Sequence, residues 1–128
     1  MSEITLKVKE GGIQFGEYKK LQAIHEAIIM SLAILYVTHE NEQEAERVVS
    51  HLLENNLVAC ANMFPIESAF QWKGGLQKER EVVTILKTRE ESWQKVRDEI
   101  EKVHPYETPC IVKFKAEANG DFEEWVRT

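Results

Sequence analysis

A continuous apolar run at residues 31–38, SLAILYVT, constrains the fold more than any other feature of the sequence. Together with the apolar residues before it, the run is still shorter than a membrane-spanning helix, which needs about 20 residues. A short apolar run of this kind is typical of a strand that is buried on both faces. We therefore expect residues 31–38 to form a central strand of a sheet, and we expect no membrane partner.

Strand and helix patterns alternate along the rest of the chain. Runs typical of strands lie at 57–64, 68–72, 81–87 and 110–115. Amphipathic helical patterns lie at 41–56, 88–103 and 121–126. Pro65 is expected to separate the first two of these strands. The order predicts an α+β fold, the ferredoxin-like split βαβ sandwich with an additional strand and a short C-terminal helix.

The two long helices carry signals for their ends and for their placement. Asn41 with Glu44, and Thr88 with Glu91, have the spacing of a helix cap. Pro105 disfavours helical geometry in the residue before it and should end the second helix. Because crossovers are right-handed, both helices should cover one face of the sheet and leave the other open. An open face with apolar side chains predicts self-association.

Residues 1–30 form an N-terminal extension with two interpretations. Alternating apolar residues on either side of Gly11 and Gly12 are typical of a β-hairpin, and residues 17–30 have helical spacing. Alternatively, the protein starts at Met30 and the extension is a non-native leader. Both interpretations place the compact domain at residues 31–128.

Composition limits the partners and the compartment. The formal net charge is −6, and an acidic protein repels phosphate backbones, so we expect no nucleic acid partner. The N-terminal sequence has no apolar segment beside a cleavage site of small residues, which predicts a cytoplasmic protein. In that reducing compartment Cys60 and Cys110 should be free thiols.

The segment HPYETPC at residues 104–110 contains an imidazole, a phenol, a carboxylate and a thiol. His104 and Thr108 both precede a proline, so the segment is expected to be extended. His104 and Cys110 then lie too far apart to share one ion, and His104 and Glu107 are still roughly 9 to 10 Å apart. A metal site here needs further ligands from elsewhere in the fold or from another subunit.

Two readings of this segment stay open. In the first, the prolines stiffen a helix-to-strand connection, and Tyr106 packs with its hydroxyl hydrogen-bonded. In the second, His104, Tyr106 and Glu107 line a subunit cleft and bind an ion or a small molecule. Trp72 and Lys87 are further candidates for ligand contacts, as an aromatic platform and as a cation at a strand-to-helix junction.

Catalytic motifs are missing from the sequence. It contains no P-loop, dinucleotide-binding, metalloprotease or EF-hand signature. A nucleophilic side chain needs a base and an oxyanion hole, often at a glycine-sharpened turn, and VACAN around Cys60 has no such turn. We therefore expect that the protein is not an enzyme.

Four motifs, in order, resemble the CutA family of divalent-cation tolerance proteins: LVACANMFPIESAFQWKG, EVVTILKTR, HPYETPCIV and DFEEWV. The resemblance runs from about Leu32 to the C-terminus. It implies a ferredoxin-like subunit that assembles into a homotrimer through its sheets. It also implies a role in tolerance of copper and other divalent ions, without an accepted enzymatic reaction.

The resemblance implies metal contacts that this chain matches in part. The copper contacts usually proposed are a cysteine near the end of the first strand, where this chain has Val37, and histidines at the HPY motif, of which only His104 is present. The family usually has glutamate where this chain has Cys110, and a thiolate favours Cu(I) or Zn. We therefore predict His104, Glu107 and Cys110 as metal donors, with no required cofactor and with copper or another divalent ion bound weakly. The alternative is a PII-like trimer that binds a small ligand for signalling, without metal dependence.

Overall fold

The computed structural model describes residues 16–22, which are helical, and residues 31–128. The elements of the second range are β1 (Leu32–His39), α2 (Glu42–Glu54), β2 (Cys60–Trp72), β3 (Gly75–Arg89), a 3-10 turn η1 (Glu90–Ser92), α3 (Trp93–Val103), β4 (Ile111–Ala116) and α4 (Gly120–Val126). The hairpin predicted around Gly11 and Gly12 lies outside the described residues. No helix in the described ranges is long and apolar enough to cross a membrane.

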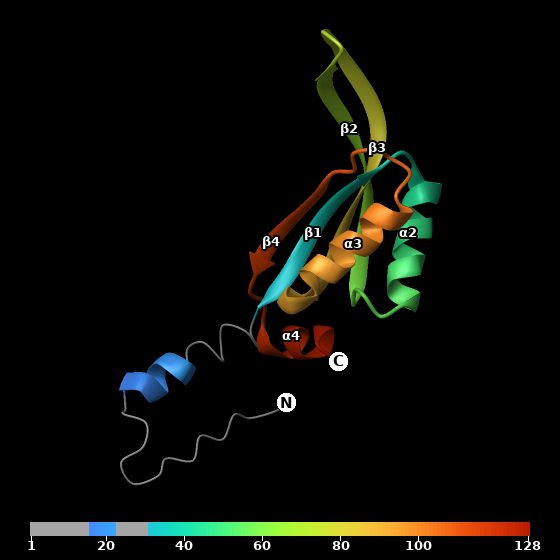
Figure 1. Cartoon of the computed structure of the whole chain (residues 1–128). Coiled ribbons are helices and arrows are strands. Elements are labelled where there is room, and N and C mark those ends of the chain that lie inside the picture. The colour runs from blue at the N-terminus through green and yellow to red at the C-terminus, as the bar shows by residue number, and fades with distance from the viewer. Residues whose placement is uncertain (1–15, 23–30) are drawn as a thin grey trace.

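The strands form one four-stranded antiparallel sheet, in the order β2-β3-β1-β4. β1 pairs with β3 along its whole length and with β4 from Leu32 to Val37, so the apolar run is a central strand, as predicted. α2 and α3 lie on the same face of the sheet (Figure 1). The α+β fold is confirmed, and so is the placement of both long helices that right-handed crossovers require.

Alternate residues of β1 build the core. Ala33, Leu35 and Val37 are 0% exposed and point toward the helices, while Ile34 and Tyr36 between them point to the opposite face. The helices contribute buried side chains to the same cluster, namely Val48, Leu52, Val96 and Ile100. Complete burial of one such apolar side chain stabilises the fold by about 1.5 to 3 kcal/mol. This single layer between sheet and helices is therefore the main source of stability.

β2 is one continuous strand, so the prediction of an additional strand is wrong. The sequence predicts a break at Pro65, yet this residue pairs with Val82 within the β2–β3 ladder. β2 is an edge strand, and a proline is tolerated there because its missing amide hydrogen can face away from the neighbouring strand. The sheet therefore has four strands where the sequence predicts five.

The outer part of the β2–β3 hairpin extends beyond the rest of the sheet (Figure 1). Residues 66–72 and 75–81 pair only with each other, because β1 pairs with β3 only as far as Val82. Lys73 and Gly74 form the turn with φ angles of 50° and 76°. Positive φ at both positions of a two-residue turn matches the twist of a hairpin. We call residues 66–81 the hairpin arm.

One of the two predicted helix caps is confirmed. The Asn41 side-chain oxygen accepts a hydrogen bond from the Glu44 amide at 2.8 Å. The Thr88 prediction is wrong, because β3 continues past this residue and α3 begins only at Trp93. Pairing with β1 keeps Thr88 in the sheet, and its hydroxyl donates to the Leu57 carbonyl at 2.8 Å instead.

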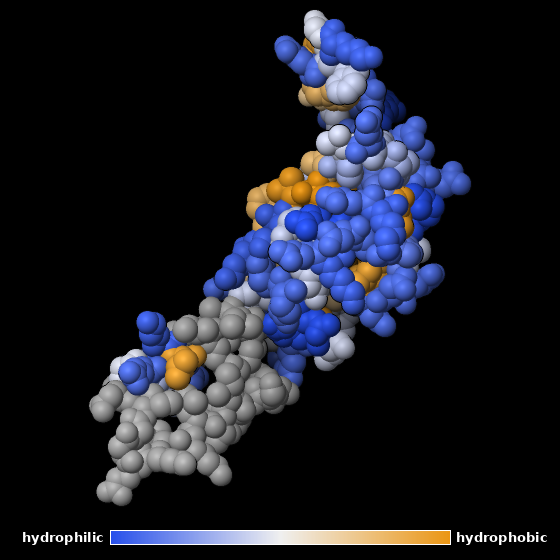
Figure 2. Space-filling model, in the orientation of Figure 1, coloured by the Kyte–Doolittle hydropathy of each residue, from blue (hydrophilic) through white to orange (hydrophobic). Residues whose placement is uncertain are grey.

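The face of the sheet opposite the helices carries exposed apolar side chains. Val112 and Phe114 of β4 pair with Tyr36 and Ile34 of β1, so all four point away from the helices. Val112 is 42% exposed and Phe114 is 57% exposed. In Figure 2, hydrophobic atoms reach the surface at the edge of the body beside β4, whereas the surface over the helices is largely hydrophilic. The open face that the topology predicts is therefore present and apolar.

Candidate functional site

His104 lies where α3 meets the segment that leads to β4. Its amide donates to the Ile100 carbonyl at 2.8 Å, which closes the last turn of the helix. Its own backbone is extended, with φ −74° and ψ 135°, because Pro105 disfavours helical geometry in the residue before it. The predicted end of the helix is confirmed, and the imidazole reaches the end of β1.

Both ring nitrogens of His104 are hydrogen-bonded. Nε2 lies 2.8 Å from the Thr38 carbonyl oxygen, and Nδ1 accepts from the backbone N–H of Tyr106 at 3.1 Å. A carbonyl can only accept, so Nε2 carries the proton and the ring is neutral. A metal ion needs a nitrogen lone pair, and the one that this ring offers, at Nδ1, is occupied. His104 can therefore bind a metal only if the hydrogen bond from Tyr106 opens.

A second histidine, His39, stacks against His104 at the end of β1. The ring centroids are 5.1 Å apart and the ring planes differ by 24°. His39 is 0% exposed, its Nε2 lies 2.8 Å from the Thr84 hydroxyl, and its Nδ1 has no hydrogen-bond partner in the described part of the chain. Burial, and then the positive charge that His104 can carry, lower the pKa of His39 to about 4. His39 is therefore neutral at pH 7.

Tyr106 links the two histidines to β3. Its ring packs edge-on against His104 with the centroids 4.7 Å apart, and its hydroxyl donates to Glu81 Oε2 at 2.8 Å. Burial and the hydrogen bond to Glu81 raise the pKa of Tyr106 well above its usual value, so the hydroxyl remains a donor at neutral pH. The structure thus shows the packed, hydrogen-bonded tyrosine of the first reading. We call His39, His104 and Tyr106 the ring cluster.

The sequence did not predict His39 as a member of this cluster. A signal was present, because residue 39 continues the alternation of Ala33, Leu35 and Val37 and should point to the core side of β1. Its partners could not be predicted in the same way. The end of β1, the middle of β3 and the end of α3 meet only in the folded sheet.

Glu107 and Cys110, the other predicted metal donors, are exposed. They follow the ring cluster along the chain, on the segment that leads to β4. Among residues 16–22 and 31–128, no group of three or more His, Cys, Asp or Glu side chains could hold a metal ion. The three predicted donors thus do not form a metal site within one chain.

Trp72 and Lys87, the other predicted ligand contacts, lie at opposite ends of the β2–β3 hairpin. Trp72 pairs with Gly75 beside the turn and is 61% exposed, whereas Lys87 pairs with Cys60 at the base. Twelve residues of strand separate Gly75 from Lys87, which is about 40 Å at about 3.3 Å per residue. The Lys87 ammonium donates to Asn62 Oδ1 at 3.0 Å. One chain therefore cannot bring Trp72 and Lys87 to the same ligand.

The hydrogen bond from Tyr106 to Glu81 is predicted to hold the 104–110 segment against β3. Tyr106→Phe should lower the free energy of unfolding by about 0.5 to 1.5 kcal/mol, the usual net contribution of one hydrogen bond. In a Glu81→Ala background the same substitution should cost less, because the acceptor is already gone. Chemical denaturation of the wild type, both single variants and the double variant measures this coupling. Strictly additive effects would contradict a direct bond.

The buried neutral His39 predicts that the protein loses stability below neutral pH. The pKa of His39 is about 4 in the folded protein and 6.5 when unperturbed, so between these values the unfolded chain binds a proton that the folded chain does not. The free energy of unfolding should be level above about pH 7 and should fall as the pH drops from about 6.5 toward 4, by on the order of 3 kcal/mol. Urea denaturation at a series of pH values, with a chelator present, measures this slope.

His39→Gln is the control for this pH dependence. The amide can still bond to the Thr84 hydroxyl but does not titrate. Between about pH 5 and 6.5, the stability of the variant should change less with pH than that of the wild type. Equal slopes in the two proteins would show that His39 is not the group responsible.

The comparison with known proteins assigns the domain to a family. The CutA1 divalent ion tolerance protein family matches residues 33–128. The divalent-cation tolerance protein CutA of Archaeoglobus fulgidus is 42% identical over 93 residues, which are 72% of this chain and 91% of that protein. Protein CutA of Homo sapiens is 32% identical over 99 residues, which are 76% of this chain and 55% of that protein.

Solved structures agree with this assignment. The structure of CutA from Archaeoglobus fulgidus, described as a periplasmic divalent cation tolerance protein, is similar with a TM-score of 0.72 and 40% identity, over 75% of this chain and 95% of that one. CutA1 from Pyrococcus horikoshii has a TM-score of 0.72 and 34% identity, over 74% of this chain and 94% of that one. The four-stranded antiparallel sheet and its helices thus match solved CutA1 structures. The chain belongs to the CutA1 divalent ion tolerance protein family.

Proposed function

We propose that this chain is a divalent-cation tolerance protein that works as a homotrimer and binds copper or another divalent ion weakly at clefts between its subunits. Membership in the CutA1 family carries the proposal. We also propose the ferredoxin-like fold for residues 31–128, with residues 1–30 as an extension outside it. The strand order β2-β3-β1-β4 and the alternation of strands and helices support this fold.

The apolar open face supports self-association. Phe114, Val112, Ile34 and Tyr36 lie together on the face opposite the helices, and an exposed apolar patch of this kind is typical of a protein interface. A second copy of the same chain has the same apolar face, so two copies can bury apolar surface against each other. The number of three subunits comes from the resemblance to the family.

Light scattering tests the assembly. The wild type should have about three times the mass of the 14.8 kDa chain. Phe114→Asp places a charge on the open face and should release monomers, because a buried unpaired charge is costly. Leu53→Asp is the matched control, since it adds the same charge on α2, at a side chain that is 40% exposed, and should leave the mass unchanged. A monomeric wild type would refute the trimer.

The exposed Glu107 and Cys110 support a metal site that needs more than one subunit. Neither side chain is covered within the chain, so both donors can face a neighbouring subunit. A carboxylate and a thiolate are too few for a closed site, and the remaining donors would have to come from the second chain. A thiolate at residue 110 favours Cu(I) or Zn. His104 contributes only if the hydrogen bond from Tyr106 opens.

Calorimetric titration of the reduced, metal-free protein with Cu(I), Cu(II) and Zn(II) tests this site. Cys110→Ser and Glu107→Gln should each weaken binding about tenfold or more, because each removes a donor. Cys60→Ser removes the other thiol, at the start of β2, and should leave the affinity unchanged. A loss in His104→Gln would mean that its Nδ1 is released on binding. Affinity that is indifferent to both Cys110→Ser and Glu107→Gln would refute the site.

We propose further that the protein is cytoplasmic and non-enzymatic, with no nucleic acid or membrane partner. Its formal net charge of −6 supports the exclusion of nucleic acid. We propose Trp72, Lys87 and Tyr106 as ligand contacts only where different subunits contribute them to one cleft. None of the relatives named above supports the PII-like alternative.

A further inference from the structure

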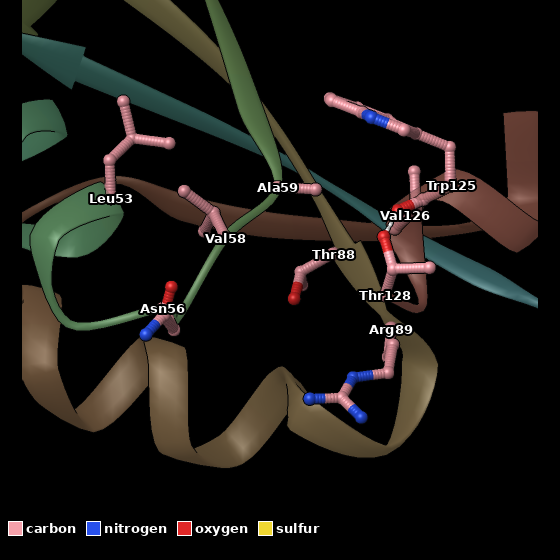
Figure 3. A pocket seen from close by; sticks show the side chains of 9 residues that line it. All are labelled: Leu53, Asn56, Val58, Ala59, Thr88, Arg89, Trp125, Val126 and Thr128. Carbon is pink, nitrogen blue, oxygen red and sulfur yellow. Dashed lines mark hydrogen bonds between the residues drawn. The ribbon is translucent and has the colours of Figure 1, made fainter.

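A hollow of about 270 Å³ lies between the end of α2, the connection from α2 to β2, the end of β3 and α4 (Figure 3). It is distinct from the ring cluster and from the predicted metal donors Glu107 and Cys110, none of which lines it. Its existence does not depend on the proposed metal function. Exposed apolar side chains and the cation of Arg89 border the same space.

The floor of the hollow is held in place by the core and by a hydrogen bond. Asn56 turns the chain after α2 with a φ of 54°. The next residues return to the core, where Val58 is 6% exposed. The hydroxyl of Thr88, which is 4% exposed, donates to the Leu57 carbonyl at 2.8 Å and fastens the connection to β3. The hollow therefore cannot close by a simple shift of a loose loop.

Two large apolar side chains stand at the rim. Leu53 of α2 is 40% exposed, and Trp125 of α4 is 52% exposed. They come from different elements, and in Figure 3 both lie in the upper part of the view, above Val58. Indole is a large, rigid apolar surface. The rim thus offers a platform for a ligand with a small apolar body.

The opposite part of the hollow is polar and positively charged. Arg89, at the end of β3, extends its guanidinium into the space below Thr88 in Figure 3. The Arg89 side chain makes no hydrogen bond or salt bridge with any described residue, although its charge helps to lower the pKa of Glu91. The Arg127 guanidinium, in contrast, is bound by the Glu91 carboxylate at 2.6 Å. A guanidinium presents two parallel N–H donors that match the two oxygens of a carboxylate.

We propose that this hollow binds a small monocarboxylate with an apolar body. The carboxylate pairs with the Arg89 guanidinium, and the apolar body lies against Leu53 and Trp125. A carboxylate is favoured over a metal ion because the lining side chains include no carboxylate, imidazole or thiol. The volume limits the body to about the size of one aromatic ring or a short alkyl chain.

Phenylacetate is the probe for this site. In two-dimensional ¹H–¹⁵N NMR of the full chain with a chelator present, titration should shift the indole N–H of Trp125 and the backbone amides of Asn56 and Arg89. A ligand of this size is expected to bind with a dissociation constant of about 10 mM or tighter. Acetate, which lacks the apolar body, and phenylacetamide, which lacks the charge, should each bind at least about tenfold more weakly.

Arg89→Gln should weaken phenylacetate binding about tenfold or more and bring it to the level of phenylacetamide. The residue is exposed, so the variant should fold, and an unchanged amide spectrum elsewhere checks this. Arg80→Gln is the matched control, an exposed arginine on the hairpin arm, and should leave binding unchanged. Equal binding of phenylacetate by the wild type and Arg89→Gln, equal binding of phenylacetate and phenylacetamide, or no shift at Trp125 would each overturn the assignment.

Discussion

The pairing of β1 between β3 and β4 is the constraint on which the rest of the structure depends. Its alternating side chains divide the molecule into a packed core with α2 and α3 on one face and an apolar open face on the other. A shift of one residue in this pairing would exchange the two faces. The C-terminal end of the strand also delivers the Thr38 carbonyl and the His39 ring to His104. The core, the open face and the ring cluster are therefore fixed together by one strand.

Hydrophobic periodicity and the residues that cap helices were sufficient to predict the elements that depend on local sequence. The apolar run of β1, the amphipathic stripes of α2 and α3 and the Asn41 cap are all properties of neighbouring residues, and each was predictable. Pro65 and Thr88 were misread because their conformation depends on the sheet. Pro65 is tolerated since β2 is an edge, and Thr88 stays extended since β1 pairs with β3 to its end. Which strand lies at the edge of the sheet, and how far two strands stay paired, depend on contacts between segments that are distant in sequence.

The candidate site likewise has features that the local sequence predicts and features that depend on the fold. The extended geometry at His104 could be predicted from Pro105, which disfavours helical geometry in the residue before it. The protonation of His104 could not be predicted, because it depends on a carbonyl of β1 and an amide beyond the proline. A residue type that is common at metal sites here joins the end of α3 to β1. The exposure of Glu107 and Cys110 likewise depends on the fold.

The hairpin arm has a consequence for how the protein opens. A two-stranded ribbon without further strands or a packed layer is only marginally stable in water. Apart from Glu81, whose side chain accepts a hydrogen bond from Tyr106, the arm has just such pairing, and it exposes Trp72 and Leu76 at 61% and 68%. The arm can therefore fray while β1 and the core remain folded, so its amides exchange with solvent at a much lower free-energy cost than those of β1. A partner molecule that covers the arm would reduce this difference in the free-energy cost of exchange. Amide exchange in the arm therefore measures how much of the arm another molecule buries.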